Sequence, residues 1–558
     1  MTNRARILCV LAVILLLPVS IVHAQTGVNL LGDSAAARVD KIFERYSRQD
    51  CPGCSLGIEQ DGKVVYTRGY GMANLEYSVP ITPATIFEAG SVSKQFTTGA
   101  IQILARRGKL SLDDDIRKYL PEVPDFGSKI TIRHLLSHTS GLRDQWELFT
   151  VMGRPPGSAV HTLDEILDLV SRQKELNFPP GTQYLYSNTG FALLAWIVRR
   201  ASGVSLAEFD SREIFQPLGM TSTQWRDDHT RIVKGRATAY STGAQGEYHS
   251  NMPFTNVYGN GGLLTTAGDL LIWNRNFENP RVIGRESLDE MQIRTRLNDG
   301  SSIIYGLGLQ VAEYKGVREI SHSGSTAGYR AFLARYPDQH LSIALLCNLA
   351  NVNAGALAHQ VAEVFLEGKI KDRAKPVRVE VPAEQIQRAA GLYRNLLTDA
   401  VLRLTVQDGK LMLGMGQGNE LVPVGENRFE ASGGAQYLFV PGQPIRLEVV
   451  TAGERPAIYH VVPAVTPSAQ QLAEYAGNYY SEELEVSYNF SVRDGRLFLK
   501  RRLMPEVAVT ATYADAFNEG GRSIRFTRNR AGEVDGLSLS SGRVLHLRFI
   551  RRPNLPPR

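Results

Sequence analysis

The residue types best suited to chemistry are a serine and a lysine three positions apart, Ser91 and Lys94. Side chains at this spacing share one face of a helix, so the lysine can take the serine proton if burial lowers its pKa. Apolar residues recur at helical spacing from about Ser91 to Arg107. The serine therefore lies at a helix N-terminus, where an oxyanion is stabilised, and we predict that it is a nucleophile. A second match, Ser171 and Lys174, lies in a charged helix end and is interpreted as surface.

A tyrosine and an asparagine form a second candidate pair, Tyr186 and Asn188. The tyrosine could relay the serine proton, and the asparagine could orient a substrate amide. Tyr186 lies in a strand-like segment directly before an apolar helix. The same spacing occurs at Tyr258, a rival in a glycine-rich loop, and at Tyr393, which belongs to a repeated unit and is interpreted as core. The alternative for any of these tyrosines is a packed ring with a satisfied hydroxyl.

A histidine followed by a glycine ends a predicted strand, in the segment His322-Ser323-Gly324-Ser325. Gly324 permits close approach of another backbone, so the N–H group of Ser325 could face a substrate. A lone histidine is more often structural than catalytic, and the neighbouring glycine only moderately favours a functional role for His322.

The patterns around these residues predict an α+β domain. A strand hairpin is expected over residues 55–69, with its turn at Asp61 and Gly62. Because strands are predicted near both ends of the region and helices between them, we expect the two ends to share one antiparallel sheet. The remaining expected elements are helices over 163–174, 190–201 and 353–367 and strands over 317–323 and 329–348.

The last third of the chain contains two copies of one unit, in which matching residues keep a constant separation. The pairs are Gly391 and Gly477, Leu411 and Leu497, and His460 and His546. Each copy has short alternating strands and little helix, which predicts two small all-β domains, each a barrel or a sandwich. We expect them to fold apart from the first domain. The predicted boundaries are a linker at 368–386, a β domain at 387–463, a linker at 464–471 and a β domain at 472–558.

Composition excludes several classes of protein. Of the 558 residues, 43% are hydrophobic and 21% charged, which is typical of soluble globular chains and argues against a disordered or polytopic membrane protein. The glycines and prolines follow no strict period, so a fibrous protein is also excluded. The net charge of +6 comes without a dense Lys/Arg tract, so no nucleic-acid partner is expected.

The first 24 residues have the pattern of a signal peptide. Arg4 and Arg6 precede an apolar run over 7–17, and small residues at 22–24 resemble a cleavage site. Removal of this segment would lower the net charge from +6 to +4. We therefore expect a secreted or periplasmic protein. No later apolar run reaches the length of a membrane span, so no membrane partner is expected after cleavage.

The four cysteines offer one candidate disulfide. Cys9 would leave with the signal peptide, and Cys347 lies in an apolar run that is typical of a buried residue. Cys51 and Cys54 form a C-x-x-C motif, with no second pair to complete a zinc site. An oxidising compartment would permit a local disulfide between them, and the alternative is two free thiols.

Taken in order, the S-x-x-K, Y-x-N and H-x-G motifs resemble those of the serine hydrolases of the class C β-lactamase and penicillin-binding superfamily. The segments FEAGSVSKQFTTGAI, YLYSNTGFALLAWIV and GNGGLLTTAGDL fit this resemblance, which covers about residues 38–367 of a domain predicted at 25–367. An H-x-G in place of K-T-G, followed by two β domains, looks most like the D-aminopeptidase arrangement. The resemblance implies a β-lactamase/transpeptidase-like antiparallel sheet with helices.

The resemblance also implies roles for the catalytic residues. Ser91 would be the nucleophile that becomes acylated, and Lys94 and Tyr186 would share proton transfer from Ser91 and to the leaving group. The backbone N–H groups of Ser91 and Ser325 would form the oxyanion hole.

Substrate binding is implied for Asn188, His322, Gly324 and Ser325. His322 would take the place of a lysine that presents a fixed cation in β-lactamases. With an ordinary pKa near 6.5, this histidine would be mostly neutral at pH 7 and would make recognition pH-dependent near neutrality. Efficient β-lactam turnover is therefore not expected.

These observations favour an exported serine hydrolase that cleaves amide or ester bonds through a Ser91 acyl-enzyme, on the D-aminopeptidase pattern. The alternatives are an esterase of the same superfamily, a penicillin-binding-like sensor that stays acylated, and a non-catalytic binding protein. We expect a small-molecule or peptide substrate, no cofactor and no metal. The sequence leaves the oligomeric state open.

Overall fold

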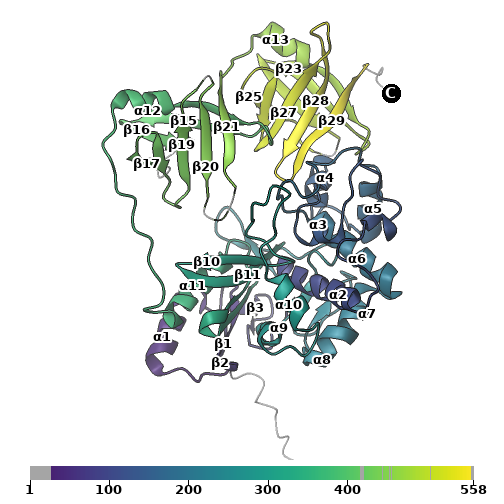
Figure 1. Cartoon of the computed structure of the whole chain (residues 1–558), viewed down its shortest axis with the longest axis vertical. Coiled ribbons are helices and arrows are strands. Elements are labelled where there is room, and N and C mark those ends of the chain that lie inside the picture. The colour runs from purple at the N-terminus through teal and green to yellow at the C-terminus, as the bar shows by residue number, and fades with distance from the viewer. Residues whose placement is uncertain are drawn as a thin grey trace, which may run out of the picture.

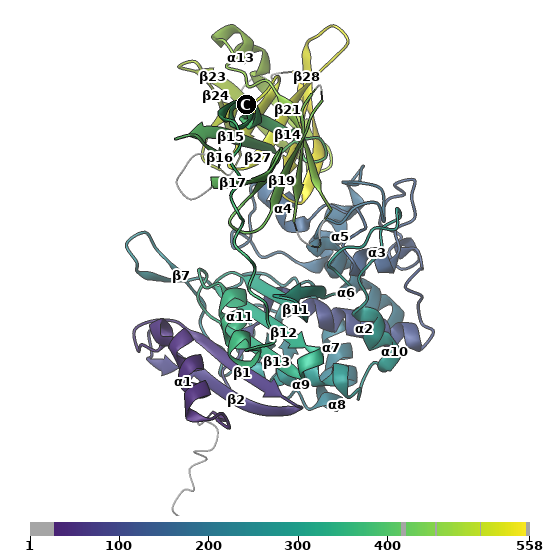
Figure 2. The same cartoon turned by 60° about the vertical axis from the view of Figure 1, so that its left-hand side comes forward.

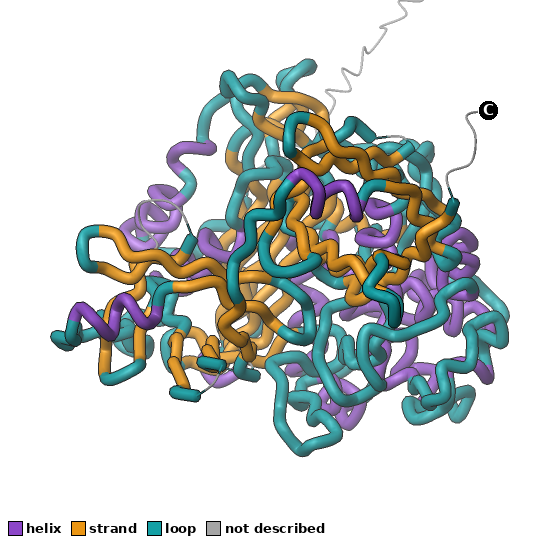
Figure 3. Tube along the Cα trace, turned by 90° about the horizontal axis from the view of Figure 1, so that it is seen from above, coloured by secondary structure: helices purple, strands orange, loops and turns teal. Residues whose placement is uncertain are grey.

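The computed structural model describes residues 27–414, 420–442, 444–451, 453, 455–502 and 504–553. The predicted signal peptide, with Cys9, lies outside the described residues. The described chain forms one α+β domain followed by two closed β-barrels (Figure 1), which confirms the predicted fold class and decides for barrels over sandwiches. In the view from above, strands make up most of the part nearest the viewer, where the two barrels lie (Figure 3).

The α+β domain is built on a six-stranded antiparallel sheet with the order β10-β11-β12-β13-β1-β2. β1 (Cys54–Gln60) pairs with β13 (Leu341–Cys347) on one side and with β2 (Lys63–Tyr70) on the other. The two ends of the domain therefore share one sheet, as expected. The other strands of this sheet are β10 (Gln310–Tyr314), β11 (Val317–Thr326) and β12 (Tyr329–Tyr336).

Helices cover both faces of this sheet. Leu341, Ile343 and Leu345 of β13 pack in one apolar cluster with α1 (Asp33–Ile42) and α11 (Ala354–Phe365). The alternate residues Ala344 and Leu346 belong to a second cluster, with α2, α6 and α9. Successive side chains of a strand point to opposite faces, so a strand buried on both faces becomes a continuous apolar run.

The helical half of the domain surrounds α2 (Lys94–Arg106), which packs against α6 (Asn188–Ser202). No single described helix is long and apolar enough to cross a membrane; only α6 and the helices that follow it, bent by 75°, meet such a test as a pair. The remaining helices are η2 (Glu44–Tyr46), η3 (Gly90–Ser93), η4 (Ile116–Lys118), α3 (Ile132–Leu136), α4 (Gln145–Val151), α5 (Leu163–Ser171), α7 (Leu206–Asp210), η5 (Ser211–Phe215), α8 (Gln216–Leu218), α9 (Ala267–Glu278), α10 (Arg285–Met291) and η6 (Pro337–Gln339). The short strands are β3 (Met72–Asn74), β4 (Val79–Pro80), β5 (Phe87–Glu88), β6 (Gln224–Trp225), β7 (Tyr240–Thr242), β8 (Tyr248–Ser250) and β9 (Leu263–Thr265).

Each barrel is an eight-stranded unit preceded by one short helix, α12 (Ala383–Ala389) or α13 (Ala469–Tyr475). These helices keep the separation of the sequence repeat and begin inside the predicted linkers, so each repeated unit starts earlier than expected. The first barrel contains β14 (Gly391–Asn395), β15 (Val401–Gln407), β16 (Lys410–Leu413), β17 (Glu420–Gly425), β18 (Arg428–Glu430), β19 (Gln436–Val440), β20 (Arg446–Val450) and β21 (Ala457–Val462). The second contains β22 (Gly477–Ser481), β23 (Val486–Arg493), β24 (Arg496–Arg501), β25 (Val507–Ala511), β26 (Ala516–Glu519), β27 (Arg522–Arg528), β28 (Val534–Ser541) and β29 (Val544–Arg552).

Equivalent tyrosines hold each helix to its barrel. The Tyr393 hydroxyl donates a hydrogen bond to the Ala389 carbonyl over 3.0 Å, and Tyr479 does the same to Tyr475 over 2.9 Å. Both tyrosines are fully buried. The interpretation of Tyr393 as a core residue is therefore confirmed.

The second barrel packs closely against the α+β domain (Figures 1 and 2), so the expectation that the whole tail folds apart is wrong. The buried side chains of this barrel belong to the same apolar cluster as α2 and α6, whereas the first barrel has its own cluster. Arg143 and Glu483, which are 1% and 5% exposed, form an ion pair across the interface with a distance of 2.6 Å. The Tyr488 hydroxyl also donates to the Val151 carbonyl over 2.9 Å.

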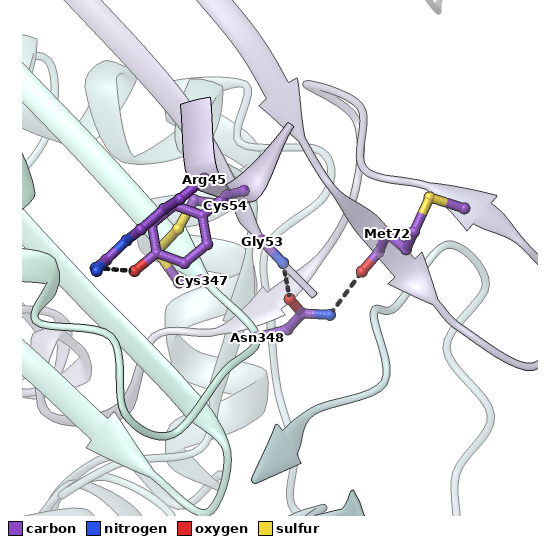
Figure 4. Close-up of a disulfide and its surroundings, with 7 residues drawn as sticks. Arg45, Gly53, Cys54, Met72, Cys347 and Asn348 are labelled. Carbon is purple, nitrogen blue, oxygen red and sulfur yellow. Dashed lines mark hydrogen bonds between the residues drawn. A yellow bond between two sulfur atoms is a disulfide. The ribbon is translucent and has the colours of Figure 1, made fainter. Parts of the chain in front are cut away.

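The disulfide joins Cys54 to Cys347, which corrects the predicted Cys51–Cys54 pair (Figure 4). Cys54 opens β1 directly opposite Cys347 at the end of β13, and their Cα atoms are 4.0 Å apart. Cys51 is a buried free thiol whose sulfur lies 3.7 Å from the Tyr46 carbonyl. Beside the disulfide, the Asn348 side chain accepts a hydrogen bond from the Gly53 N–H and so fixes the start of β1.

Candidate active site

Ser91 and Lys94 lie in contact at the start of α2. The Lys94 amine nitrogen Nζ is 3.1 Å from Ser91 Oγ, and it donates to Asn188 Oδ1 over 3.0 Å and to the Asn260 carbonyl over 2.6 Å. Ser91 lies in the one-turn 3₁₀ helix η3, which continues directly into α2. The i, i+3 spacing therefore brings the two side chains together, as the motif predicts.

Lys94 is completely buried, and this burial is the main reason why its pKa lies well below the ordinary value for lysine. The nearby Arg543 guanidinium lowers the pKa further, and the Asp144 carboxylate opposes both effects. Burial and the Arg543 charge together outweigh the effect of Asp144 and favour the neutral amine, which can accept a proton from the serine that it contacts.

Tyr186 lies between two basic side chains. Lys94 Nζ is 4.8 Å and Arg543 Cζ is 4.7 Å from the centre of its ring. The Tyr186 hydroxyl is buried and makes no hydrogen bond of standard geometry to the described residues. Burial raises the pKa of this hydroxyl, and the nearby Ser91 hydroxyl and Arg543 charge offset only a part of the rise. The preceding segment is extended loop and forms no strand, contrary to its strand-like pattern.

The rival residues lie elsewhere. The Tyr258 ring packs 6.1 Å from the Trp225 ring and does not line the cleft that contains Ser91. Ser171 donates a hydrogen bond to the Asp168 carbonyl within its own helix, and the Lys174 side chain forms an exposed ion pair with the second barrel. The structure therefore brings together Ser91, Lys94 and Tyr186 and none of the rivals.

Asn188 uses its amide mainly to position Lys94. Its Oδ1 accepts from Lys94, and its Nδ2 and backbone N–H both donate to Asp144 Oδ2, over 2.8 and 2.7 Å. The Asp144 carboxylate is fully buried and also caps α4 by accepting from the Trp146 N–H over 3.0 Å. Our sequence reasoning missed Asp144. The available signal was an aspartate with a glutamate three residues later, a pattern typical of a helix start.

Two glycines bring β11 against the serine turn. A Cβ atom on Gly324 would lie 2.0 Å from the Ala89 carbonyl oxygen, and one on Gly90 would lie 2.6 Å from the Ser325 nitrogen. Gly90 also has a φ of +53°, in the left-handed region that favours glycine. The Ser325 backbone therefore lies beside the turn that carries Ser91, which is the arrangement that a shared oxyanion hole requires.

His322 is a buried residue of β11 and stays neutral near pH 7. Its Nδ1 lies 2.6 Å from the Ser323 carbonyl and its Nε2 lies 2.8 Å from the Tyr305 hydroxyl. The carbonyl requires a donor, which assigns the proton to Nδ1 and makes Nε2 the acceptor from Tyr305. Burial, followed by the charge of Lys94, lowers the pKa of His322 to about 3. The expected titration near neutrality is therefore wrong, and Tyr305 is a second residue that sequence reasoning missed.

A cleft of about 650 Å³ joins these groups. Ser91, Tyr186, Asn188, His322 and Ser325 all line it, and Arg543 enters it from the second barrel. Gly324 stands between two lining residues of β11, Ser323 and Ser325, and does not itself line the cleft. Among the described residues, no group of three or more His, Cys, Asp or Glu side chains is placed to hold a metal ion.

Comparisons with known proteins identify the family of the chain and neighbours of its fold. The family model for Beta-lactamase matches residues 39–365. Penicillin-binding protein 4* of Bacillus subtilis is 33% identical over 55% of this chain and 70% of its own length. D-aminopeptidase of Brucella anthropi is 27% identical over 90% of this chain and 95% of its own. An octameric penicillin-binding protein homologue from Pyrococcus abyssi, 24% identical, matches the fold with a TM-score of 0.54 over 84% of this chain and 98% of its own.

Proposed function

Because the chain belongs to the beta-lactamase family, we propose that it is an exported serine hydrolase that cleaves amide or ester bonds through an acyl-enzyme on Ser91. The observation that carries this proposal is the contact of 3.1 Å between Ser91 Oγ and a fully buried lysine of lowered pKa. The likeness to a D-aminopeptidase along nearly the whole chain supports a small peptide or amide substrate, with D-configured residues as the first to test.

In the acylation step, Ser91 Oγ attacks the carbonyl carbon of the substrate and its proton passes to Lys94 Nζ. The C–O bond to the serine forms while the carbonyl becomes an oxyanion, which the N–H groups of Ser91 and Ser325 stabilise. The tetrahedral intermediate then expels the amine or alcohol. The leaving group takes the proton from Lys94 through the Tyr186 hydroxyl, which has no other hydrogen-bond partner among the described residues.

Deacylation repeats the same steps with water as the nucleophile. Lys94 and Tyr186 accept a proton from the water as it attacks the ester of Ser91, and they return a proton to Ser91 Oγ as the acid leaves. Asn188 holds Lys94 in place throughout. His322, as a neutral group beside Ser325, shapes the substrate site without supplying a charge.

Export is supported by the disulfide between Cys54 and Cys347, because disulfides persist mainly in oxidising compartments. It agrees with the signal-peptide pattern at the N-terminus, and we place the working enzyme outside the cytoplasm. Expression with and without residues 1–24, followed by fractionation, tests this part of the proposal.

The test of function is labelling and turnover with a matched pair of variants. A fluorophosphonate probe should label the wild-type chain on Ser91, and hydrolysis of p-nitrophenyl acetate and of the neutral peptide N-acetyl-D-Ala-D-Ala amide should be lost in Ser91→Ala but kept in Ser171→Ala. Labelling of Ser91→Ala at the wild-type rate would overturn the proposal. A labelled enzyme that never turns over would favour the penicillin-binding-like sensor, and turnover of esters alone would favour the esterase.

A further inference from the structure

The second barrel delivers an arginine into the candidate active site. Arg543 lies in the tight turn between β28 and β29, and it lines the same cleft as Ser91 and Tyr186. The backbone of the turn is held to the α+β domain, because Asn177 Nδ2 donates to the Arg543 carbonyl over 3.0 Å and Asn177 Oδ1 accepts from the Leu545 N–H over 2.8 Å. The position of this arginine is therefore set by main-chain contacts and does not depend on its side chain.

The guanidinium of Arg543 is available to a ligand. Its side chain is 42% exposed, and it makes no hydrogen bond to the described residues. The guanidinium carbon lies 4.7 Å from the centre of the Tyr186 ring, and Nη1 forms a long ion pair of 3.8 Å with Asp144 Oδ2, without a hydrogen bond. Stacking on the ring holds the planar group, and its N–H donors stay open to the cleft.

The charge that faces the cleft is positive. The other two charged residues of the lining, Glu88 and Arg226, are 1% and 3% exposed and form a double hydrogen-bonded ion pair at 3.0 and 2.8 Å. They therefore cancel one another. Asp144 is fully buried beneath Asn188, which donates two hydrogen bonds to its Oδ2 atom. The exposed charge in the cleft belongs to Arg543.

On these observations, and resting on the function proposed above, we infer that Arg543 binds a carboxylate of the substrate close to the scissile bond. A guanidinium presents paired N–H donors that match the two oxygens of a carboxylate, and the partly closed cleft strengthens the attraction. The same charge repels a substrate that carries a free ammonium group at this position. The substrate class is thus a short peptide or acyl compound with a carboxylate beside the bond that is cleaved.

Four related peptides test the inference. They are N-acetyl-D-Ala-D-Ala, with a carboxylate on the leaving half; N-succinyl-D-Ala-D-Ala amide, with one on the acyl half; the neutral N-acetyl-D-Ala-D-Ala amide; and D-Ala-D-Ala amide, with an ammonium group. For each peptide we would measure kcat/KM and the inhibition constant against p-nitrophenyl acetate hydrolysis. The kcat/KM of one of the two carboxylate peptides should exceed that of the neutral peptide by at least about tenfold, as expected of a hydrogen bond to a charged group. Which of the two peptides is preferred tells which half of the substrate Arg543 contacts.

The variants separate charge from structure. In Arg543→Gln, the ratio of kcat/KM for the preferred carboxylate peptide to kcat/KM for the neutral peptide should fall to within about twofold of one. Arg543→Lys should keep part of this preference, and Arg543→Glu should shift it toward the ammonium peptide. Arg548→Gln is the matched control, because Arg548 lies on β29 with a side chain that is 72% exposed and pairs with Glu175, and it should keep the wild-type ratio.

Two outcomes would overturn the inference: a wild-type preference for the ammonium peptide, or a ratio that Arg543→Gln and Arg543→Glu leave unchanged. Failure of the proposed function looks different, because hydrolysis of the neutral ester would then persist in Ser91→Ala. If Ser91→Ala loses ester hydrolysis but the Arg543 variants keep the wild-type ratio of kcat/KM values, the inference about Arg543 is rejected and the proposed function stands.

Discussion

The side chain of Asn188 holds Lys94 by a hydrogen bond of 3.0 Å from the lysine Nζ to the amide oxygen Oδ1. Asp144 accepts two hydrogen bonds from the same asparagine, so the orientation of its amide is decided: Nδ2 faces the carboxylate and Oδ1 faces the lysine. A buried neutral amine that donates to two oxygens, Asn188 Oδ1 and the Asn260 carbonyl, can turn its lone pair toward the Ser91 hydroxyl and is a prepared proton acceptor.

Loss of the proton-transfer groups should cost turnover. We expect Lys94→Met and Tyr186→Phe each to lower kcat by at least about a hundredfold, the usual size of a general acid–base contribution. Tyr258→Phe is the control and should stay within about twofold of the wild type, since Tyr258 does not line the cleft. Steady-state kinetics with the neutral ester measures this, and damage from Tyr258→Phe alone would mean that Tyr186 is the wrong tyrosine.

The acid limb of the pH–rate profile should report Lys94. Catalysis needs the neutral amine, so the rate falls as pH drops through the lowered pKa of Lys94, well below the ordinary 10.5. Arg543 contributes to that lowering, so Arg543→Gln should raise the pKa of Lys94 and move the acid limb to higher pH. The measurement is kcat/KM for the neutral ester from pH 4 to 10. An acid limb that moves to lower pH in this variant would contradict the assignment.

His322 should make the fold sensitive to acid. Its pKa is about 3 in the folded chain and near 6.5 when unfolded, so the unfolded state takes up a proton as pH falls below 6.5. The stability due to this residue is therefore complete above pH 6.5 and is lost toward pH 3, by about 1.4 kcal/mol per pH unit.

Urea unfolding at pH 7 and pH 5 measures this loss. The difference in free energy of unfolding between the wild type and His322→Gln should shrink at pH 5. His249→Gln is the control, since that side chain is 62% exposed, and its difference should change less than that of His322→Gln. Parallel changes in both variants would show that His322 is not the source.

The disulfide should stabilise the α+β domain. It closes a loop across a sequence separation of 293 residues, and removal of a native disulfide typically costs about 2–5 kcal/mol. We expect Cys54→Ser and Cys347→Ser each to lower the melting temperature, and Cys51→Ser to have a smaller effect. Alkylation of the unfolded but unreduced protein, followed by mass spectrometry, should modify Cys51 and leave Cys54 and Cys347 unmodified; modification of Cys347 would refute the pairing.

The second barrel should depend on one buried ion pair. Glu483→Gln leaves the Arg143 charge buried without its partner, which should destabilise the protein by about 3–5 kcal/mol. The neighbouring Glu482→Gln removes an exposed pair with Lys174 and should cost less than about 1 kcal/mol. Equal melting temperatures for the two variants would show that the interface does not need the buried pair.

Local motifs in the sequence anticipated much of the α+β domain and of the site. The Ser91–Lys94 pair depends on helical spacing, and the hairpin of β1 and β2 depends on an Asp-Gly turn, so both can be predicted from short segments. The repeat predicted two matching β domains because it preserved the glycines and leucines that each barrel needs.

The missed features all depend on contacts between distant segments. Cys54 pairs with Cys347 because β1 lies beside β13, and the C-x-x-C spacing carries no information about that register. In the sequence, Arg543 looks like an ordinary arginine of a surface turn, because its place in the cleft depends on the contact between the second barrel and the α+β domain. His322 has an ordinary titration range in the sequence and loses it only through burial beside Lys94 and Tyr305.

The pairing of β1 with β13 has a consequence for how the chain reaches its folded state. β1, which begins at Cys54, cannot pair along its full length with β13 until Cys347 has been synthesised. At a synthesis rate of 5–20 residues per second, that delay is roughly 15–60 s. For this interval the apolar β1–β2 hairpin has one unpaired edge, and long-range pairing of this kind slows folding. The domain therefore completes its central sheet late, and the pairing of β1 with β13 is what holds Cys54 and Cys347 opposite one another in the native register.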